Sequence, residues 1–215
     1  MSHARRGGRP SRETSEQLGA LILDAATELF LTHGFGATSV EAVAQRARIS
    51  KRTFYHRFED KSALFAAVVH RVVESLRPSA GIPLIEGTDP QATLERLAAL
   101  ILQAALSPQA IALHRMIVAE SARFPELAAV VAREGATEEA IKLIAGLLEH
   151  EAKAGRLRCV DSIFAAHQFL QMVIGLPQRR AMGLGRPMSK RDLVEWPRKV
   201  VDLFLNGCRV EERCP

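Results

Sequence analysis

Apolar residues recur at helical spacing along most of the chain, and polar caps and helix breakers separate these runs. Over residues 16–32 an apolar residue returns every three or four positions, and Gly34 follows as a stop signal. The pattern predicts a long first helix with one buried face. That face consists of Leu18, Ile22, Ala25, Ala26, Leu29 and Phe30.

Residues 38–61 predict two short helices joined by a tight turn. Thr38 and Glu41 stand at capping-box spacing in front of an apolar helical face. Ile49 lies in the turn, and Ser50 is placed to cap a second helix over residues 51–58. Asp60 then precedes a third, longer run.

The second short helix has an apolar and a polar side. Phe54 and Phe58 are four residues apart and share the inner face, which turns the neighbouring side chains outward. A short helix with basic and aromatic residues pointing outward suits the major groove of DNA. The outward residues are Lys51, Arg52, Tyr55 and His56.

A basic helical face is usually no more than a solvated surface, so the face alone does not decide the function. The order of the parts favours DNA binding: cap, apolar face, turn, second cap, basic-aromatic face. Moreover, no acidic residue lies between Ala42 and Phe58, which leaves a positive field suited to phosphates. We therefore interpret this stretch as a helix-turn-helix unit.

The remaining chain predicts further helices. A run over 61–76 ends before a Pro/Gly-rich segment, 78–90, which we expect to connect a small domain to a larger one. Caps and breakers then predict helices from 90 to 106, 108 to 123, 125 to 135, 137 to 154, 161 to 175 and 190 to 206. Thr137 is the expected cap of the fourth of these. Pro197 is expected to kink the last helix or delay its start.

Composition supports an all-α fold. Hydrophobic residues make up 47% of the 215-residue chain but aromatic residues only 5%, and Ala and Leu are abundant. We expect a flexible basic arm over 1–15, a helix-turn-helix DNA-binding domain over 16–62, and a helical regulatory and dimerisation domain over 63–215. The net charge of +5 suits an anionic partner without proving one.

Other classes of site find little support. Cys159, Cys208 and Cys214 lack metal-ligand spacing, and no run resembles a phosphate loop, a zinc site or a nucleophile elbow. No apolar run is long enough to span a bilayer, and no secretory signal is recognisable. We expect a cytoplasmic protein with no catalytic residues, cofactor, metal or membrane partner.

Residues 18 to about 69 resemble the N-terminal domain of TetR-family transcriptional regulators. The ordered set that carries the resemblance is Ala25, Ala26, Leu29, Phe30, Gly34, Phe35, Thr38, Ser39, Val40, Ala44, Ala47, Ile49, Ser50, Thr53, Phe54, Tyr55, Phe58, Lys61 and Leu64. Residues 113–185 resemble the regulatory region of the AefR-like subgroup, through HRMIVAESARFPELA, the turn at Gly155, and HQFLQMVIGLPQRRAMGLG.

The resemblance implies contacts to double-stranded DNA. Ser50, Lys51, Arg52 and Tyr55 correspond to residues that touch bases or nearby backbone, and Thr38, Thr53, His56 and Lys61 to residues that touch phosphates. Two positions depart from the family pattern: Arg48 stands where Gly is usual and φ is often positive, and Arg52 where a small residue is common. In the arm, Arg5, Arg6 and Arg9 could follow phosphates or a minor groove, or only aid solubility.

The resemblance also implies a homodimer and a small, largely apolar ligand. The dimerising residues would be Phe164, Met172, Leu193, Trp196, Val200 and Phe204, since apolar positions exceed what one protomer can bury. Ligand candidates are His114, Met116, Phe124, Phe169 and Met172, although residues of these types on a helix more often belong to the ordinary core. A two-fold dimer predicts a near-palindromic operator.

Three functional hypotheses remain open at this point. The first is a repressor released by a small molecule, as the resemblance implies. The second is an activator or a ligand-independent DNA-binding regulator. The third is a helical enzyme or interaction module whose basic face is incidental, which predicts weak DNA binding without sequence preference.

Overall fold

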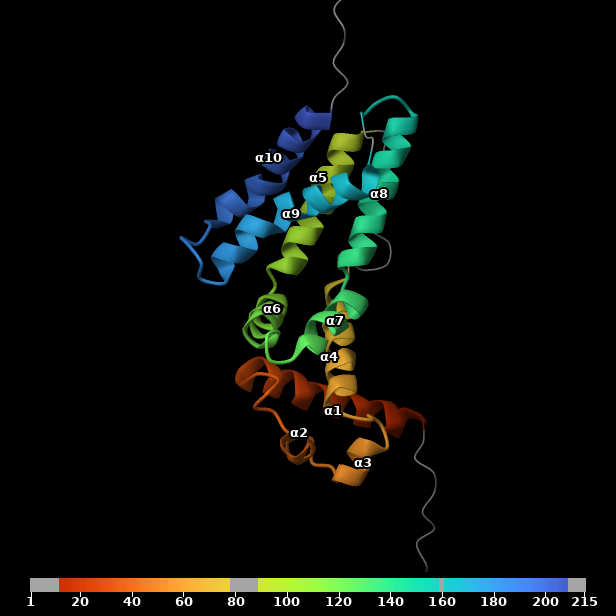
Figure 1. The fold of residues 1–215 in the computed structure, drawn as a ribbon, viewed down its shortest axis with the longest axis vertical. Helices are drawn as coiled ribbons and strands as arrows, with labels where there is room; N and C mark the ends of the chain where they lie inside the picture. Colours follow the sequence, from red (N-terminus) through yellow and green to blue (C-terminus); the bar gives the residue numbers. More distant parts are fainter. Residues whose placement is uncertain (1–11, 78–88, 159–160, 209–215) are drawn as a thin grey trace, which may run out of the picture. The chain divides into compact units, whose positions relative to one another are not determined.

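The computed structural model describes residues 12–77, 89–158 and 161–208, and all of the regular structure in these ranges is α-helical (Figure 1). The predicted all-α fold is therefore confirmed. The helices are α1 (Arg12–His33), α2 (Val40–Arg46), α3 (Lys51–Tyr55), α4 (Lys61–Leu76), α5 (Pro90–Ala105), α6 (Pro108–Glu120), α7 (Pro125–Glu134), α8 (Thr137–Lys153), α9 (Ser162–Ala181) and α10 (Lys190–Cys208).

The chain forms two compact units. The first, which we call the head, comprises Met1–Arg71 together with Met116–Val131; the second, the body, comprises Val72–Arg115 and Ala132–Pro215. Helices α4, α6 and α7 each begin in one unit and end in the other. The head thus includes a stretch from the middle of the chain, which the predicted domain ranges do not include.

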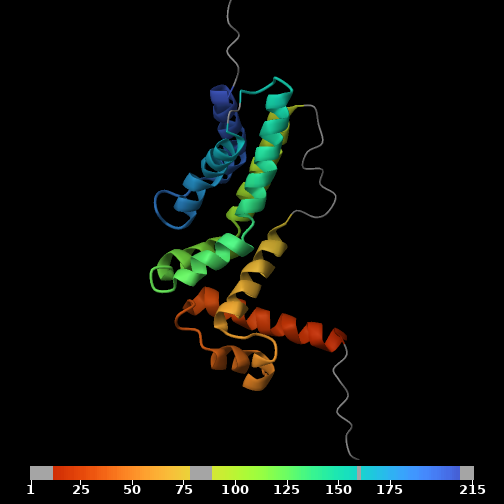
Figure 2. The ribbon, with the colours of Figure 1, turned by 45° about the vertical axis from the view of Figure 1, so that its right-hand side comes forward.

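An aromatic cluster forms the centre of the head, where α2 and α3 lie beside α1 (Figure 2). Phe30 on α1, Phe35 just after it, and Phe65 on α4 are all buried. Their ring centroids lie 5.5–5.7 Å apart, within the range of favourable aromatic pairs. Phe30 and Phe35 precede α2 in the chain and Phe65 follows α3, so their packing holds together the two ends of the stretch that contains α2 and α3.

The body is built from α5, α8, α9 and α10, which share one apolar core. Phe169 on α9 is fully buried, and its ring lies 5.0 Å from that of Phe204 on α10. Trp196 on α10 donates its indole N–H to the carbonyl of Val173, 2.9 Å away. Both contacts hold α9 and α10 together within one protomer.

Several predicted helix starts are confirmed by cap geometry. The side chain of Ser50 accepts from the backbone N–H of Thr53 at the start of α3 (3.1 Å), and that of Asp89 does the same for α5 (Gln91 N, 3.0 Å). Asp161 caps α9 by accepting from Phe164 N at 2.8 Å. Gly155, with a φ of +72°, follows α8 as the predicted stop.

Two predicted caps are wrong. Thr38 does not cap α2, because its hydroxyl is buried and donates to the carbonyl of Gly34. Ser39 takes this place and accepts from Ala42 N at 3.1 Å. Thr137 is the first residue of α8 rather than its cap, and Ala136 precedes it without a side-chain hydrogen bond.

Two predicted bounds also differ. The second helix of the helix-turn-helix ends at Tyr55 instead of continuing to 58, since His56 already forms its C-cap. Helix α9 likewise continues to Ala181 instead of ending at 175. Helix α10 begins at Lys190 as predicted, so Pro197 does not delay its start. There, Ser189 accepts from Asp192 N and donates its hydroxyl to the Asp192 carboxylate, a reciprocal cap that sets the start.

Candidate nucleic-acid interface

The outer face of α3 carries most of the predicted base-contacting residues. Phe54 is fully buried, whereas Tyr55 is 55% exposed and rests edge-on against the Phe54 ring at 5.3 Å. Arg52 and His56 are also exposed. The prediction that Phe54 points inward and Tyr55 outward is therefore confirmed, and α3 presents an aromatic and cationic surface.

The N-terminus of α3 is organised by two hydroxyl groups. The Ser50 hydroxyl lies 2.8 Å from the Thr53 hydroxyl, in addition to its bond to the Thr53 N–H. Ser50 is exposed and Thr53 is half-buried. Both oxygens are thus held beside the first turn of α3, where a DNA backbone or base edge could reach them.

Lys51 is engaged in an ion pair. Its ammonium group contacts the carboxylate of Glu41 on α2, and both side chains are more than half exposed. Hydrogen bonding from Lys51 is the main cause that holds the pKa of Glu41 below its ordinary value. In this structure Lys51 links α2 to α3, so a DNA phosphate would have to compete with Glu41 for it.

The turn between α2 and α3 contains Arg48 in the left-handed region, with a φ of +56°. Among the described residues it is the one non-glycine with positive φ. The predicted positive φ is thus confirmed, and a side chain there carries a conformational cost. Arg48 is exposed beside the predicted contact surface.

Two predicted phosphate contacts lie inward. Thr38 is only 3% exposed, and its hydroxyl is already bonded to Gly34 O. The Lys61 ammonium donates to the carbonyls of Phe35 (2.9 Å) and Thr38 (3.0 Å), so it holds the turn between α1 and α2. Burial lowers the pKa of Lys61, with a partly compensating attraction to Glu120.

The five ligand candidates are divided between the two units. Met116 and Phe124 belong to the head, where the Phe124 ring packs against Phe35 at 5.2 Å. His114, Phe169 and Met172 belong to the body; there Phe169 is buried and Met172 packs against the same core. Phe124 and Phe169 therefore have structural packing roles, whatever else they contact.

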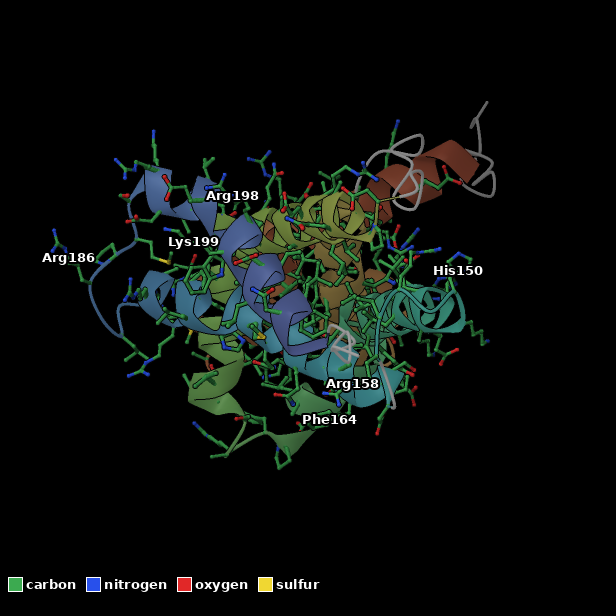
Figure 3. All side chains as sticks on the ribbon, turned by 90° about the horizontal axis from the view of Figure 1, so that it is seen from above. His150, Arg158, Phe164, Arg186, Arg198 and Lys199 are labelled. Carbon is green, nitrogen blue, oxygen red and sulfur yellow. The ribbon has the colours of Figure 1, made fainter. Side chains whose placement is uncertain are left out.

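The predicted dimerising residues differ in how far they are exposed. Val200 and Phe204 are buried in the protomer's own core, and Leu193, Trp196 and Met172 pack against it partly exposed. Phe164 is different: it is 61% exposed at the outside of α9 (Figure 3). The periodicity of α10 located its apolar face, but it could not show whether helices of the same protomer or a second copy of the chain cover that face.

Sequence reasoning missed several residues that the structure brings forward. Val194 and Leu203 on α10 are 81% and 66% exposed, an unusual fraction for such side chains. Leu203 directly precedes the buried Phe204, and Val194 directly follows the half-buried Leu193, so the signal in the sequence was an apolar residue beside the predicted buried face. The carboxylate of Glu120 accepts from the backbone N–H of Gly36 at 2.6 Å, and this role could only be recognised from the fold.

Arg5, Arg6 and Arg9 lie outside the described residues. Within the described ranges, no cluster of His, Cys, Asp or Glu has the makings of a metal site. No single helix of that part of the chain is long and apolar enough to cross a membrane, although α5 and α6, bent by 65°, meet the same criteria as a pair.

Comparison with known families bears directly on this interface. Residues 22–68 match the model described as bacterial regulatory proteins, tetR family, and residues 92–207 match the AefR-like transcriptional repressor, C-terminal domain. The chain belongs to the TetR family. The first match spans the helix-turn-helix, and the second spans most of the body.

Known TetR-family proteins resemble the whole chain or its head. The solved structure of the flavonoid-responsive regulator FrrA superposes with a TM-score of 0.73 and 31% identity, covering 93% of this chain and all of that one. The transcriptional repressor KstR2 of Rhodococcus jostii is 28% identical over 75% of this chain and 79% of its own length. The transcriptional activator FasR of Mycolicibacterium smegmatis is 39% identical, but over only 34% of this chain and 32% of its own length.

This TetR-family protein is a DNA-binding transcriptional regulator and not an enzyme. The family matches cover both the helix-turn-helix and the C-terminal domain, so the interpretation of a basic face on an unrelated helical module is excluded. The exposed surface of α3 is accordingly its candidate DNA-reading surface.

Proposed function

We propose that the protein is a cytoplasmic homodimeric repressor that binds a near-palindromic operator and is released by a small, largely apolar ligand. The observation that carries the proposal is the exposed face of α3, where Tyr55 and Arg52 project from a helix anchored by Phe54. A side-chain set of this kind reads base edges in a major groove.

Contacts to bases or to nearby backbone are assigned to Ser50, Lys51, Arg52 and Tyr55, and contacts to phosphates are assigned to Thr53 and His56. Arg52 is the strongest candidate for specificity, because a guanidinium can bind the O6 and N7 atoms of one guanine together. Thr38 and Lys61 would contribute to DNA binding indirectly, because their hydrogen bonds hold the turn that precedes α2. The arm residues Arg5, Arg6 and Arg9 would add phosphate contacts.

A second copy of the chain is the proposed partner of α9 and α10. Large apolar side chains remain exposed on both helices at Phe164, Val194 and Leu203, and exposed apolar surface usually marks association. Met172, Leu193 and Trp196, which are partly exposed, would also contact the second copy. Val200 and Phe204 are buried, so they would contribute by holding α10 in place. Two heads related by a two-fold axis require two half-sites, which is why the operator should be nearly palindromic.

Repression and ligand release rest on the relatives. The C-terminal match is to a repressor domain, KstR2 is named a repressor, and FrrA is named as responsive to flavonoids. A ligand that binds better to the DNA-free arrangement must weaken DNA binding by the same factor. Flavonoids are therefore the first compounds to test, with His114, Phe169 and Met172 as body residues to vary.

The second candidate function is activation, or regulation without a ligand. FasR, which is named an activator, matches this chain across the DNA-binding region. The α3 surface suits either direction of control, because the sign depends on where the operator lies relative to the promoter.

Selection of bound DNA from a random pool, followed by footprinting, tests the proposal. A single protected site with two inverted half-sites is the expected result, and loss of the footprint with a flavonoid would support ligand release. Transcription from a promoter carrying the selected site then separates repression from activation. Binding without any sequence preference would contradict the assignment of α3.

A further inference from the structure

A short stretch from the middle of the chain forms part of the head. Residues 116–131, which include the end of α6 and the start of α7, cluster with the helix-turn-helix. Helix α6 itself begins at Pro108, in the body. Glu120 is the last residue of α6 and belongs to the head.

Glu120 holds the backbone that leads from α1 to α2. Its Oε2 atom accepts from the N–H of Gly36 at 2.6 Å, across 84 residues of sequence. A hydrogen bond between a carboxylate and a backbone amide is charge-assisted and stronger than a neutral one. Glu120 is half-buried, so water competes only in part for this bond.

Two glycines leave the space that this carboxylate occupies. A Cβ atom on Gly34, which has a φ of +86°, would overlap Glu120 Oε1. A Cβ atom on Gly36 would come within 2.9 Å of the Phe124 ring and 3.0 Å of Glu120 Oε2. Gly34 therefore does more than end α1, because side chains at both positions would push Glu120 away.

Lys61 holds the same connection from its other side. Its ammonium donates to the carbonyls of Phe35 and Thr38 and lies 4.3 Å from the centre of the Phe35 ring. Phe124 packs on that ring at 5.2 Å. The N–H and C=O groups of the connection are thus bound to charged side chains from two distant helices.

This connection determines where α2 begins. It ends at Ser39, the N-cap of α2, and α2 in turn contacts α3. A shift of the connection would therefore move α2 and the DNA-reading surface together.

We propose that Glu120 is a positioning residue for DNA binding: its carboxylate fixes the α1–α2 connection, through the Gly36 amide, in the geometry that DNA requires. The proposal requires DNA binding by the head, but neither repression nor a ligand.

The sign of a mutational effect tests this proposal. Removing an acidic group from a DNA-binding unit ordinarily strengthens binding, since repulsion of the phosphates decreases. Glu120→Ala is expected to do the opposite and weaken binding to a selected operator by about five- to tenfold, because the Gly36 amide loses its acceptor. The slope of log affinity against log salt should stay unchanged, because no phosphate contact is lost.

Glu126 provides the matched control. It is an exposed acid in the same stretch of the head, and its charge also acts on Lys61. Glu126→Ala should leave affinity unchanged or slightly higher. Glu120→Gln, which keeps an acceptor oxygen, should restore most of the affinity lost in Glu120→Ala.

Amide hydrogen exchange of the free full-length protein supplies a readout that needs no DNA. Exchange at Gly36 should accelerate in Glu120→Ala and stay at the wild-type rate in Glu126→Ala, with the melting temperature followed alongside. Faster exchange confined to the α1–α2 connection supports the proposal. Operator affinity that rises or stays constant in Glu120→Ala, or exchange that accelerates throughout the head, overturns it.

Discussion

At the scale of single residues, Arg48 has a backbone conformation that its Cβ atom disfavours. Its φ of +56° is a conformation that glycine adopts without cost. We predict that Arg48→Gly stabilises the protein by about 0.5–1 kcal/mol, because the steric strain of the Cβ atom disappears. The measurement is urea unfolding of both proteins.

Arg48→Ala is the control for this prediction. It removes the same guanidinium but keeps the Cβ atom, so it should gain little stability. Equal stabilisation by Ala and Gly would mean that charge repulsion, and not backbone strain, is relieved. The sequence allowed the positive φ to be predicted, because the turn position was recognisable, but not the contacts of the side chain.

The ion pair of Glu151 and Arg156 links stability to pH. Arg156 donates from Nε and Nη2 to the nearly buried carboxylate of Glu151, at 2.5 and 3.0 Å. These hydrogen bonds hold the pKa of Glu151 below its ordinary value. The carboxylate therefore adds stability that is fully present above its unfolded-state pKa, and this stability is lost as the pH falls through the lower folded-state pKa.

We predict that Glu151→Gln is less stable than wild type at neutral pH and that the difference shrinks as the solution is acidified. Urea unfolding at pH values from about 7 down to about 3 measures the difference. Arg156→Gln should show the same convergence, because it removes the partner that lowers the pKa. A constant difference across the series would count against this pair as the pH-dependent element.

At the scale of helices, caps explain both the correct and the incorrect boundaries. Ser50, Asp89 and Asp161 were predictable because a short polar side chain stands directly before an apolar periodic run. Thr38 met the same local rule, but the tertiary structure buries it, and its hydroxyl donates to the carbonyl of Gly34 instead of accepting from a backbone N–H of α2. Local sequence cannot show which of Thr38 and Ser39 caps α2. The choice depends on the hydrogen bonds of Thr38 to Gly34 and to Lys61, which form only in the folded head.

The cap of α9 leads to a prediction for this element. Asp161→Ala should lower the free energy of unfolding by about 1 kcal/mol, because the Phe164 N–H loses its acceptor at the start of the helix. Asp161→Asn should be nearly neutral, since Asn caps as well as Asp. Denaturant unfolding of the two variants checks the pair, and a similar loss in both would indicate that the negative charge matters instead.

At the scale of the whole molecule, the exposed apolar side chains of α9 and α10 bear on whether two copies of the chain associate. Helices α9 and α10 were predictable as apolar from periodicity, but which of their residues remain exposed depends on how the other body helices cover them. For that reason Val200 and Phe204 lie in the core, and Val194 and Leu203 are exposed.

We predict that Val194→Glu combined with Leu203→Glu converts the proposed dimer to a monomer while the helical content is retained. Two charges in an apolar interface must be desolvated without partners, which opposes association. Light scattering coupled to size-exclusion chromatography measures the mass. Val118→Glu changes another exposed apolar residue, which lies on α6 and is 59% exposed, and it should leave the proposed dimer intact. A monomeric wild type would contradict the proposed assembly itself.

The pairing of Lys51 with Glu41 has a consequence for how the regulator tolerates changes in the ionic medium. A lysine that leaves an internal carboxylate for a phosphate exchanges one anionic neighbour for another. Dissolved ions weaken both attractions, so part of the penalty on the complex is cancelled by the penalty on the free protein. Raising the salt concentration is then expected to weaken operator binding less steeply than a count of positive charges on α3 suggests.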